Sequence, residues 1–416
     1  MKAYFEIYGC TANKSDSSLV KGILKENNYE IVENITDADL IIIHTCTVIN
    51  TTEQRMLSRM KNFSQFGKKV VVCGCMASVQ KDLIKDILPD ALFLPPQFSH
   101  HIVDILNGKN IRFVDKNKTL FSKYYDGIIA PISIAEGCNF SCSYCITSIA
   151  RGKLKSYPIS EITQDICSAI KKGCREIQLT AQDTSSYGID NKNNLGNLLK
   201  NIHKIPGHFR IRVGMMNPYT CLQNINSIID GFEDLRIYKF LHLPVQSGDN
   251  IILKKMKRKY TVKDFFEIIK KFQSKYPEIT ISTDIIVGFP SESDRQFQNT
   301  IKLLEKLRPD ITNITRYSAR PFTTAKKMPG RLKTEIVKKR SKILTDICNN
   351  MSKEKNQDQI GKIYDVLITE IGKEGTFVGR AENYKPVVIK EKVELGEFIS
   401  VQIIDAASTY LFGSII

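Results

Sequence analysis

The strongest constraint on the fold is a regular alternation of short apolar segments with longer amphipathic ones across the middle of the chain. Between residues 131 and 318 this alternation repeats six times. The predicted strands are 132–135, 176–180, 209–214, 240–245, 279–287 and 311–317, and the predicted helices between them are 160–172, 195–203, 222–230, 262–274 and 293–306. Repeated strand–helix units favour parallel strands with crossover helices, and six units fit an open or partial barrel. The active site of such a barrel lies at the carboxyl ends of its strands.

Residues 1–125 carry a second, shorter series of the same kind. Its predicted strands are 3–8, 40–45, 69–73 and 91–94, and its predicted helices are 15–27, 50–62, 78–87 and 100–106. The strands include apolar runs such as LIIIH and KVVVC, which are typical of parallel strands buried on both faces. We expect a small parallel α/β domain here, followed by a polar, turn-rich linker at 115–127.

The last part of the chain, 358–416, has a different pattern. Short strands are separated by glycines and no helical period is present, which predicts a small all-β barrel close to an OB fold in size. A basic helical stretch, 332–357, precedes it. The predicted fold class is therefore α/β, with an N-terminal parallel α/β domain at 1–125, a partial (β/α)6 barrel with a basic linker helix at 128–357, and an all-β barrel at 358–416.

The interpretation of the eleven cysteines depends on the compartment that the chain is expected to occupy. No apolar run approaches the ~20 residues needed to cross a bilayer, and the N-terminus MKAYFEIYGC lacks a secretory signal. These features predict a cytoplasmic protein without a membrane partner. In a reducing cytosol, clustered cysteines are more often metal ligands or catalytic groups than disulfides, and an odd number argues against a complete disulfide framework.

The formal net charge of +16 is concentrated in one part of the chain. The whole basic excess lies in 128–358 and includes the runs KKMKRK at 254–259 and KKR at 338–340. Solvated helix faces would explain single runs. A localised surplus of this size favours a polyanionic partner, because phosphates add Coulomb attraction and counterion release. Nucleic acid is the partner that we predict.

The strongest local motif is a CxxxCxxC made by Cys138, Cys142 and Cys145, directly after the first predicted strand of the central series. Three thiolates this close in sequence can bind three irons of a [4Fe–4S] cluster and leave the fourth iron open for chemistry. Zinc is the alternative, but a structural zinc site takes four ligands and no fourth Cys or His is adjacent. Tyr144, before the last cysteine, either packs on an adenine or belongs to the core.

Three further cysteines share one position relative to predicted strands. Cys10, Cys46 and Cys75 each follow an apolar strand and one intervening glycine or threonine. The carboxyl ends of parallel strands lie along one sheet edge, so these thiols can converge despite their separation in sequence. Each alone would be explained as a small buried hydrophobic residue, as Cys73 is. The repeated pattern favours a common site.

The CxxxCxxC motif, with an aromatic residue before its last cysteine, resembles the motif of the radical S-adenosylmethionine (SAM) superfamily. The resemblance implies that the open iron chelates SAM, and that one electron cleaves SAM to methionine and a 5′-deoxyadenosyl radical. No catalytic side chain beyond the cluster ligands is implied. By their position at strand ends, the expected SAM contacts are Tyr144, Gln182, Asp183, Gln246 and Ser247.

The N-terminal cysteine segments YGCTANKSDS (8–17), HTCTVINTTE (44–53) and GCMAS (74–78) resemble the methylthiotransferase family of radical SAM enzymes. This resemblance implies a second [4Fe–4S] cluster on Cys10, Cys46 and Cys75, whose open iron carries the sulfur to be transferred. Segments such as RVGMMNP (212–218) and RYSARP (316–321) are most similar to the archaeal and eukaryotic branch. That branch converts N6-threonylcarbamoyladenosine at tRNA position 37 to its 2-methylthio derivative and consumes two SAM molecules.

The C-terminal segment GTFVGRAENYKPVVI (375–389) resembles a TRAM domain, an RNA-binding β-barrel. The RNA contacts that we expect there, next to the anticodon loop, are Arg380, Lys385, Phe377 and Tyr384, by charge attraction and base stacking. The resemblance also implies an electron-donating reductase, ferredoxin or flavodoxin, and we expect a monomer.

Other functions are compatible with the same residues. The closest alternatives are a methylthiotransferase that acts on isopentenyladenosine in tRNA, or on an aspartate of a ribosomal protein. A third alternative, of another class, is a non-catalytic RNA-binding protein whose cysteines hold a structural metal.

Overall fold

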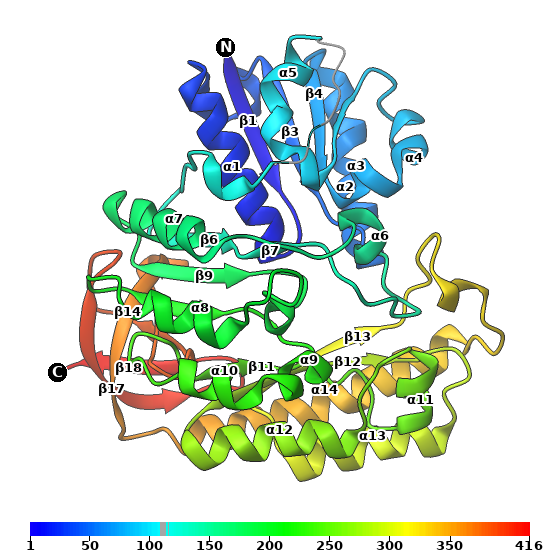
Figure 1. The fold of residues 1–416 in the computed structure, drawn as a ribbon. Helices are drawn as coiled ribbons and strands as arrows, with labels where there is room; N and C mark the ends of the chain where they lie inside the picture. Colours follow the sequence, from blue (N-terminus) through cyan, green and yellow to red (C-terminus); the bar gives the residue numbers. More distant parts are fainter. Residues whose placement is uncertain (109–113, 115) are drawn as a thin grey trace.

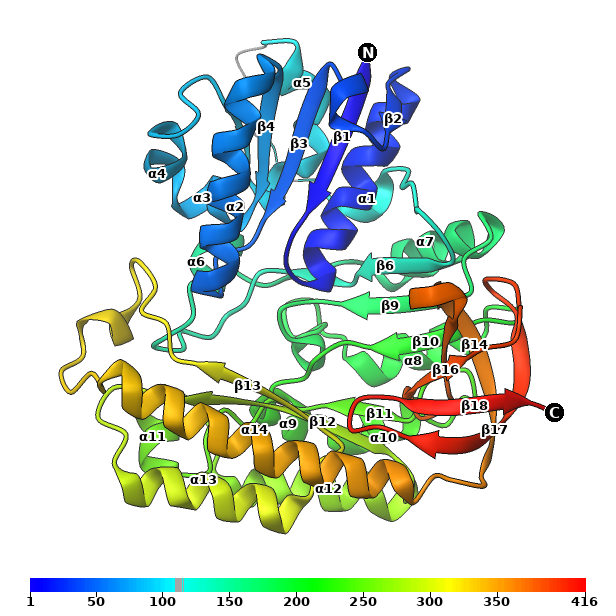
Figure 2. The ribbon, with the colours of Figure 1, turned by 180° about the vertical axis from the view of Figure 1, so that it is seen from behind.

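The structure is a computed structural model that describes residues 1–108, 114 and 116–416. It has three parts, which Figures 1 and 2 show from opposite sides. The N-terminal sheet stands on one side of a central set of parallel strands and helices, and a small β-barrel closes one end of that central set. The predicted α/β fold class, with an all-β barrel at the C-terminus, is confirmed.

The N-terminal part is a parallel sheet with helices on both faces. Its strand order is β2-β1-β3-β4-β5, with β1 Lys2–Ile7, β2 Glu30–Val32, β3 Leu40–Thr45, β4 Lys69–Gly74 and β5 Leu92–Leu94. Helices α1 (Thr11–Glu26) and α5 (Ile102–Leu106) bury one face, and α2 (Asn50–Phe63) and α3 (Cys75–Val79) bury the other. The central strands β1, β3 and β4 are the three that precede Cys10, Cys46 and Cys75.

One predicted helix in this part is wrong. The stretch predicted as a single helix at 78–87 forms two short helices, α3 and α4 (Lys81–Lys85). The break lies at Gln80, whose backbone leaves the helical region. The Gln80 side chain is buried, where it donates to Glu53 and accepts from Thr47, and these long-range contacts outweigh local helix propensity.

The central part is a partial barrel of six parallel strands in two groups of three. The first group has the order β10-β9-β6 and the second β11-β12-β13, and a bridge between Ile211 and Ile237 joins them. The strands are β6 Ile129–Ser133, β9 Glu176–Thr180, β10 Arg210–Val213, β11 Phe240–His242, β12 Thr280–Val287 and β13 Ile311–Arg316. The helices that cover them are α7 Ile159–Lys171, α8 Leu195–Ile202, α10 Ile225–Gly231, α12 Val262–Lys275, α13 Asp294–Leu307 and α14 Thr334–Gln357.

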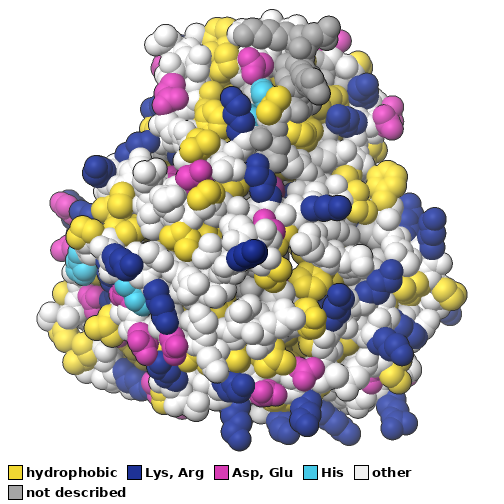
Figure 3. Space-filling model, viewed as in Figure 1, with side chains coloured by type: hydrophobic (Ala, Val, Ile, Leu, Met, Phe, Trp, Pro, Cys, Tyr) yellow, Lys and Arg dark blue, Asp and Glu magenta, His cyan; other side chains and the backbone are white. Residues whose placement is uncertain are grey.

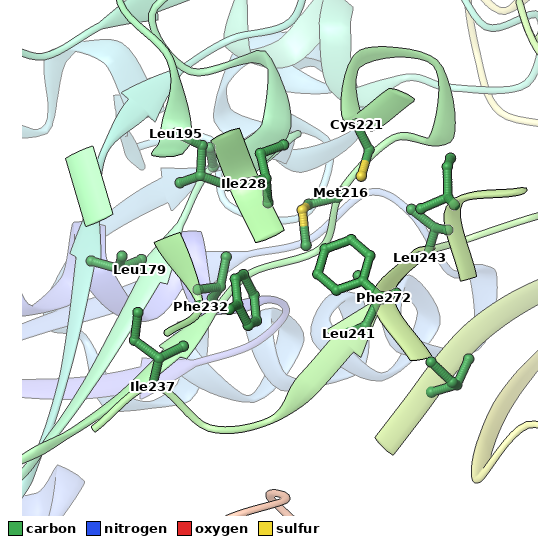
Figure 4. Packing of buried hydrophobic residues seen from close by; sticks show 14 of the residues in the cluster. Leu179, Leu195, Met216, Cys221, Ile228, Phe232, Ile237, Leu241, Leu243 and Phe272 are labelled. Carbon is green, nitrogen blue, oxygen red and sulfur yellow. The ribbon is translucent and has the colours of Figure 1, made fainter. Parts of the chain in front are cut away.

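Along these strands, apolar side chains alternate with polar ones. The apolar side chains form a core beneath the helices, and the polar ones face the inside of the barrel. Figure 4 shows Leu179 and Leu241 of the strands packed with Ile228, Phe232 and Phe272 of the helix layer. The last two rings meet edge to face, with centroids 5.6 Å apart. The alternate residues of the strands face the inside of the barrel, which we call the lumen.

The C-terminal part is a closed five-stranded barrel in the order β14-β15-β16-β18-β17. Its strands are β14 Ile363–Ile371, β15 Phe377–Arg380, β16 Pro386–Ile389, β17 Phe398–Ala406 and β18 Leu411–Ile415. It contacts the amino ends of the central strands, because Arg210 pairs with Asp365 and the Lys239 amide donates to the Glu382 carbonyl at 2.8 Å.

The segment predicted as a polar linker is anchored by buried charges where it is described. Lys118 pairs with Asp16 and Glu136, and Lys123 pairs with Asp165. Both lysines are buried, so this segment packs between the N-terminal and central parts. The predicted linker residue 115 lies outside the described residues. Among the described residues, no helix combines the length and apolarity needed to cross a bilayer.

Candidate active site

The CxxxCxxC segment forms a loop between β7 (Ala135–Glu136) and α6 (Thr147–Arg151). Ser143, inside the motif, is fixed to two other segments. Its amide donates to the Met256 carbonyl at 3.1 Å, its hydroxyl donates to the Lys255 carbonyl at 2.8 Å, and its carbonyl accepts from the Ala325 amide at 2.7 Å. The loop is therefore held by the segments that follow α11 (Asn250–Lys255) and β13.

The three thiols of this loop are half-buried and interact with one another. The pKa of Cys138 is raised to about 12, mainly by burial and in smaller part by the nearby Asp183, Cys145 and Cys142. Arg258 donates from Nη1 to the Cys142 sulfur at 3.4 Å. Arg258 was not among the predicted site residues, because it lies within a basic run.

The second set of cysteines lies at the carboxyl ends of three adjacent strands. Ile7 pairs with His44, and Thr45 pairs with Gly74, so the loops that carry Cys10, Cys46 and Cys75 start side by side. A Cβ on Gly9 would lie only 3.4 Å from the Cys46 sulfur.

Cys46 and Cys75 are buried and Cys10 is exposed, and both Cys10 and Cys46 lie close enough to Cys75 to affect its pKa. Burial raises the pKa of Cys75 to about 12, and nearby thiolate charge on Cys10 and Cys46 adds to the shift. Asn13 ties two of the loops together, because its side-chain amide donates to the carbonyls of Tyr8 and Thr45, each at 2.8 Å. The predicted convergence of the strand ends is thus present, and the ligand role of the thiols stays a prediction.

The donor chemistry of both sets fits iron–sulfur clusters. Each set offers three thiols, which are the usual ligands of such clusters, and three of them leave one iron open. Among the described residues, no three His, Cys, Asp or Glu side chains are placed to share a single metal ion.

Two buried ion-pair networks connect the parts that carry the two cysteine sets. In the first, Arg151 of α6 donates to Glu136 at 2.7 Å, to Asp16 at 2.8 Å and to Asn13 at 2.6 Å. Lys118 completes this network by pairing with both carboxylates. The Arg151 side chain also lies against the Cys75 thiol and partly offsets the rise in its pKa that burial causes. The N-terminal sheet is therefore locked to the helix that follows Cys145.

The second network involves the loop after β13. Arg320 donates to Glu53 of α2 and, at 3.3 Å, to the hydroxyl of Thr47, which directly follows Cys46. Gln80 donates to the same Glu53 at 2.8 Å. Arg320 and its partners are all buried. Neither Arg151 nor Arg320 was predicted from the sequence.

The expected SAM contacts differ in whether their polar atoms already have partners among the described residues. Gln182, beyond β9, has a buried Oε1 without a partner among the described residues, and Gln246, beyond β11, forms a bridge with Ile285 of β12. Tyr144 packs against a small core that includes Met256 and Phe289. These residues lie at the carboxyl ends of the strands, as expected.

Asp183 and Ser247 are engaged with the protein. Burial raises the pKa of Asp183, although hydrogen bonds from Thr220, Asn217 and Ser185 oppose the shift. The Ser247 hydroxyl is buried and accepts from the Asp249 amide at 3.2 Å. Their observed contacts organise the loops after β9 and β11.

The expected RNA contacts of the C-terminal barrel are placed differently from the prediction. Tyr384 is inserted between Tyr238 and Phe240, with ring centroids 4.8 and 4.9 Å away, and its hydroxyl donates to Glu176 at 3.3 Å. The buried ammonium of Lys385 donates to Asp310 at 2.9 Å. Both side chains close the amino end of the central barrel, and in this arrangement neither is available to an RNA.

The other two expected RNA contacts are half-buried. Phe377 packs against the core of the C-terminal barrel. Arg380 lies over the Tyr384 ring, 5.0 Å from its centroid, and donates to Glu370 at 3.4 Å.

Comparisons with known proteins agree with this arrangement. Residues 2–94 match the family described as "Uncharacterized protein family UPF0004", residues 132–304 match the "Radical SAM superfamily" and residues 357–416 match the "TRAM domain". Among solved structures, the radical SAM methyltransferase TsrM from Kitasatospora setae shares the fold with a TM-score of 0.58, at 11% identity, over 78% of this chain and 76% of that one.

Curated relatives match over the full length. A protein of Archaeoglobus fulgidus named "Probable threonylcarbamoyladenosine tRNA methylthiotransferase" is 40% identical over 100% of this chain and 99% of its own. The "Threonylcarbamoyladenosine tRNA methylthiotransferase" of Homo sapiens is 33% identical over 99% of this chain and 73% of its own. The chain therefore belongs to the threonylcarbamoyladenosine tRNA methylthiotransferase family of radical SAM enzymes.

Proposed function

We propose that this enzyme attaches a methylthio group to C2 of N6-threonylcarbamoyladenosine at tRNA position 37, with two [4Fe–4S] clusters and two SAM molecules. The observation that carries this proposal is the presence of two separate sets of three thiols on parts of the chain locked together by buried ion pairs. Cys138, Cys142 and Cys145 would hold one cluster, and Cys10, Cys46 and Cys75 the other. When bound, the clusters and SAM supply the electron, the radical and the sulfur.

The protein's own contribution is to hold both reacting groups in one geometry. Arg151 and Arg320 fix the N-terminal sheet against the loops around the CxxxCxxC segment, so the two sites cannot drift apart during the reaction. Arg258, donating to the Cys142 sulfur, stabilises negative charge on that ligand. Gln182 and Gln246 would orient SAM from the strand ends.

The surface around the CxxxCxxC loop suits a nucleic acid. Six exposed cations lie on the two segments that anchor Ser143, and we call them the basic rim: Lys254, Lys257, Lys259, Lys326, Lys327 and Arg331. Figure 3 shows Lys and Arg side chains gathered at the lower right, over the region of α11, α13 and the loop before α14. Contacts from these cations to phosphates would position the anticodon loop over the strand ends.

Phe322 supplies an apolar contact within the basic rim. It is 71% exposed and has a φ of 62°, a strained conformation for a bulky residue. The strain is maintained by its neighbours, because Arg320 is ion-paired and the Thr323 hydroxyl donates to the Arg320 carbonyl at 2.8 Å. We assign Phe322 to stacking on a base of the anticodon loop, whose unpaired bases are easily splayed out.

The proposal is tested by anaerobic reconstitution followed by incubation with SAM and threonylcarbamoylated tRNA. Mass spectrometry of the nucleosides should show the 2-methylthio derivative, with an electron donor of the ferredoxin, flavodoxin or reductase kind. Wild type should bind about eight irons per chain, and alanine replacement of either cysteine set should leave about four. Product formed from isopentenyladenosine instead, or loss of all iron on replacing one set, would contradict the proposal.

Further measurements on the same reconstituted protein address the remaining expectations, which are its oligomeric state and its bound metal. A single elution volume matching one chain would agree with a monomer. Zinc as the only bound metal, with no cleavage of SAM, would indicate a non-catalytic RNA-binding protein.

A further inference from the structure

An arginine in the lumen of the central barrel has no carboxylate partner within the described part of the chain. On β10, Ile211 and Val213 belong to the core under the helices, so Arg212 between them faces the lumen. Gln178, its partner in the register with β9, does the same between Ile177 and Leu179.

The contacts of Arg212 are aromatic. Its guanidinium lies over the rings of Phe240 and Tyr384, 5.5 and 5.9 Å from their centroids. Its Nε is buried without a partner, and no ion pair or hydrogen bond of its guanidinium is found among the described residues. A guanidinium carries five donors in a planar fork, and a buried donor left without an acceptor, as Nε is here, is costly.

Arg151 and Arg320, which are buried, also leave Nε without a partner among the described residues, but each has a carboxylate partner for its charge. Arg151 pairs with Glu136 and Asp16, and Arg320 pairs with Glu53. Arg212 is half-buried. It differs from these arginines because no carboxylate of the described residues forms an ion pair with it. This is the state expected of a residue whose acceptor comes with a ligand.

The position of Arg212 fits a ligand that enters from the strand ends. Arg212 precedes Val213, the last residue of β10, so one strand step of about 3.3 Å separates it from the end of that strand. In the same lumen His242 contacts Asp284 at 2.9 Å, and burial leaves the His242 Nδ1 without a partner among the described residues. Asn313 also donates to Asp284 at 2.8 Å, and Arg258 contacts the Cys142 sulfur at 3.4 Å, so polar groups lie both in the lumen and beside the thiols.

We propose that Arg212 binds the carboxylate of the threonylcarbamoyl group and thereby selects this nucleoside over adenosines with an uncharged N6 substituent. The inference rests on the proposed function and deepens it. The amino acid arm would extend from N6 into the lumen, while C2 stays at the strand ends. A planar fork matches a carboxylate in a bidentate manner, which a lysine at the same place cannot reproduce.

The test uses the reconstituted full-length enzyme and two anticodon stem–loops. One carries N6-threonylcarbamoyladenosine, and the other carries the same nucleoside with its carboxylate converted to a carboxamide. Wild type should prefer the carboxylate by about 10- to 150-fold in kcat/KM, because losing a hydrogen bond to a charged group weakens binding by about this factor. Arg212→Gln should lose this preference by slowing the carboxylate substrate alone, and Arg212→Lys should restore only part of it. Equilibrium binding of both stem–loops to the cluster-free protein should show the same pattern.

A packing role for Arg212 predicts a different result. Arg236 provides the matched control, because its guanidinium also lies over a ring, 4.8 Å from the Phe209 centroid, but is paired with Asp234. Arg236→Gln should leave the preference for the carboxylate unchanged, whatever its effect on stability. If Arg212→Gln slowed both substrates equally, or if wild type did not discriminate between them, the inference would be overturned while the proposed function stood. Failure of wild type to modify the threonylcarbamoylated stem–loop would overturn both.

Discussion

Removing one partner of the buried pair between Arg320 and Glu53 should destabilise the protein more than removing both. The two side chains are 4% and 8% exposed, so either charge left alone is desolvated without compensation. We expect Arg320→Met to cost about 3–5 kcal/mol, because Glu53 would keep only its hydrogen bond from Gln80. The double replacement Glu53→Gln with Arg320→Met should recover much of this loss, since the carboxylate is then replaced by a neutral amide.

The measurement is a double-mutant cycle on urea-induced unfolding of the cluster-free protein, followed by circular dichroism. The coupling energy should be about 2–4 kcal/mol. The pair of Arg308 and Glu354, which is 52% and 58% exposed, gives the matched control and should couple by less than about 1 kcal/mol. If the two cycles gave the same coupling, the interpretation of Arg320 as a lock between the parts of the chain would be wrong.

Four further predictions concern the cysteine loops, the RNA-facing surface and the pH dependence. Gly74→Ala should halve the iron content, because Gly74 has a φ of 85° and a Cβ would lie 2.6 Å from the Thr45 carbonyl oxygen. The control is Gly67→Ala, because Gly67 has a φ of 59° but open space around it. A full iron content in Gly74→Ala would refute the reasoning. Phe322→Ala should weaken binding of the anticodon stem–loop by about 5- to 150-fold in fluorescence anisotropy, while Phe322→Tyr and the control Leu235→Ala, at an 82% exposed position, should bind as wild type. Lys326→Gln with Lys327→Gln should reduce the slope of log affinity against log salt by about 1 per lysine, and an unchanged slope would place the RNA elsewhere. Burial lowers the pKa of His100 from 6.5 to about 4, so its contribution to stability is complete above pH 6.5 and is lost as the pH falls towards 4. The free energy of unfolding of wild type relative to His100→Phe should therefore decrease over this range. The decrease should be gentler than the limiting slope of about 1.4 kcal/mol per pH unit.

The parallel strands and the proximity of Cys10, Cys46 and Cys75 could be predicted because they depend on local patterns. An apolar run followed by glycine or threonine and cysteine marks the end of a strand, and parallel strands place such ends at one edge. The same reasoning located Gln182 and Gln246 at the open ends of the barrel strands.

The arginines of the site could not be predicted in this way. Arg258, Arg151 and Arg320 meet partners that are 116, 135 and 267 residues away in sequence, and no local period records such contacts. Tyr384 and Lys385 were misplaced for the opposite reason. Their segment has the composition of an exposed loop, but aromatic and charged partners on the central barrel bury both side chains.

The insertion of Tyr384 into the amino end of the central barrel also affects where molecules can enter and leave the enzyme. Tyr384 and Lys385, packed against Glu176 and Asp310, occupy that end of the barrel. In the proposed reaction, SAM, its cleavage products and the target nucleoside would therefore all enter and leave at the carboxyl ends of the strands. A tRNA seated there would act as a lid, so exchange of spent for fresh cofactor has to be timed around its arrival and departure.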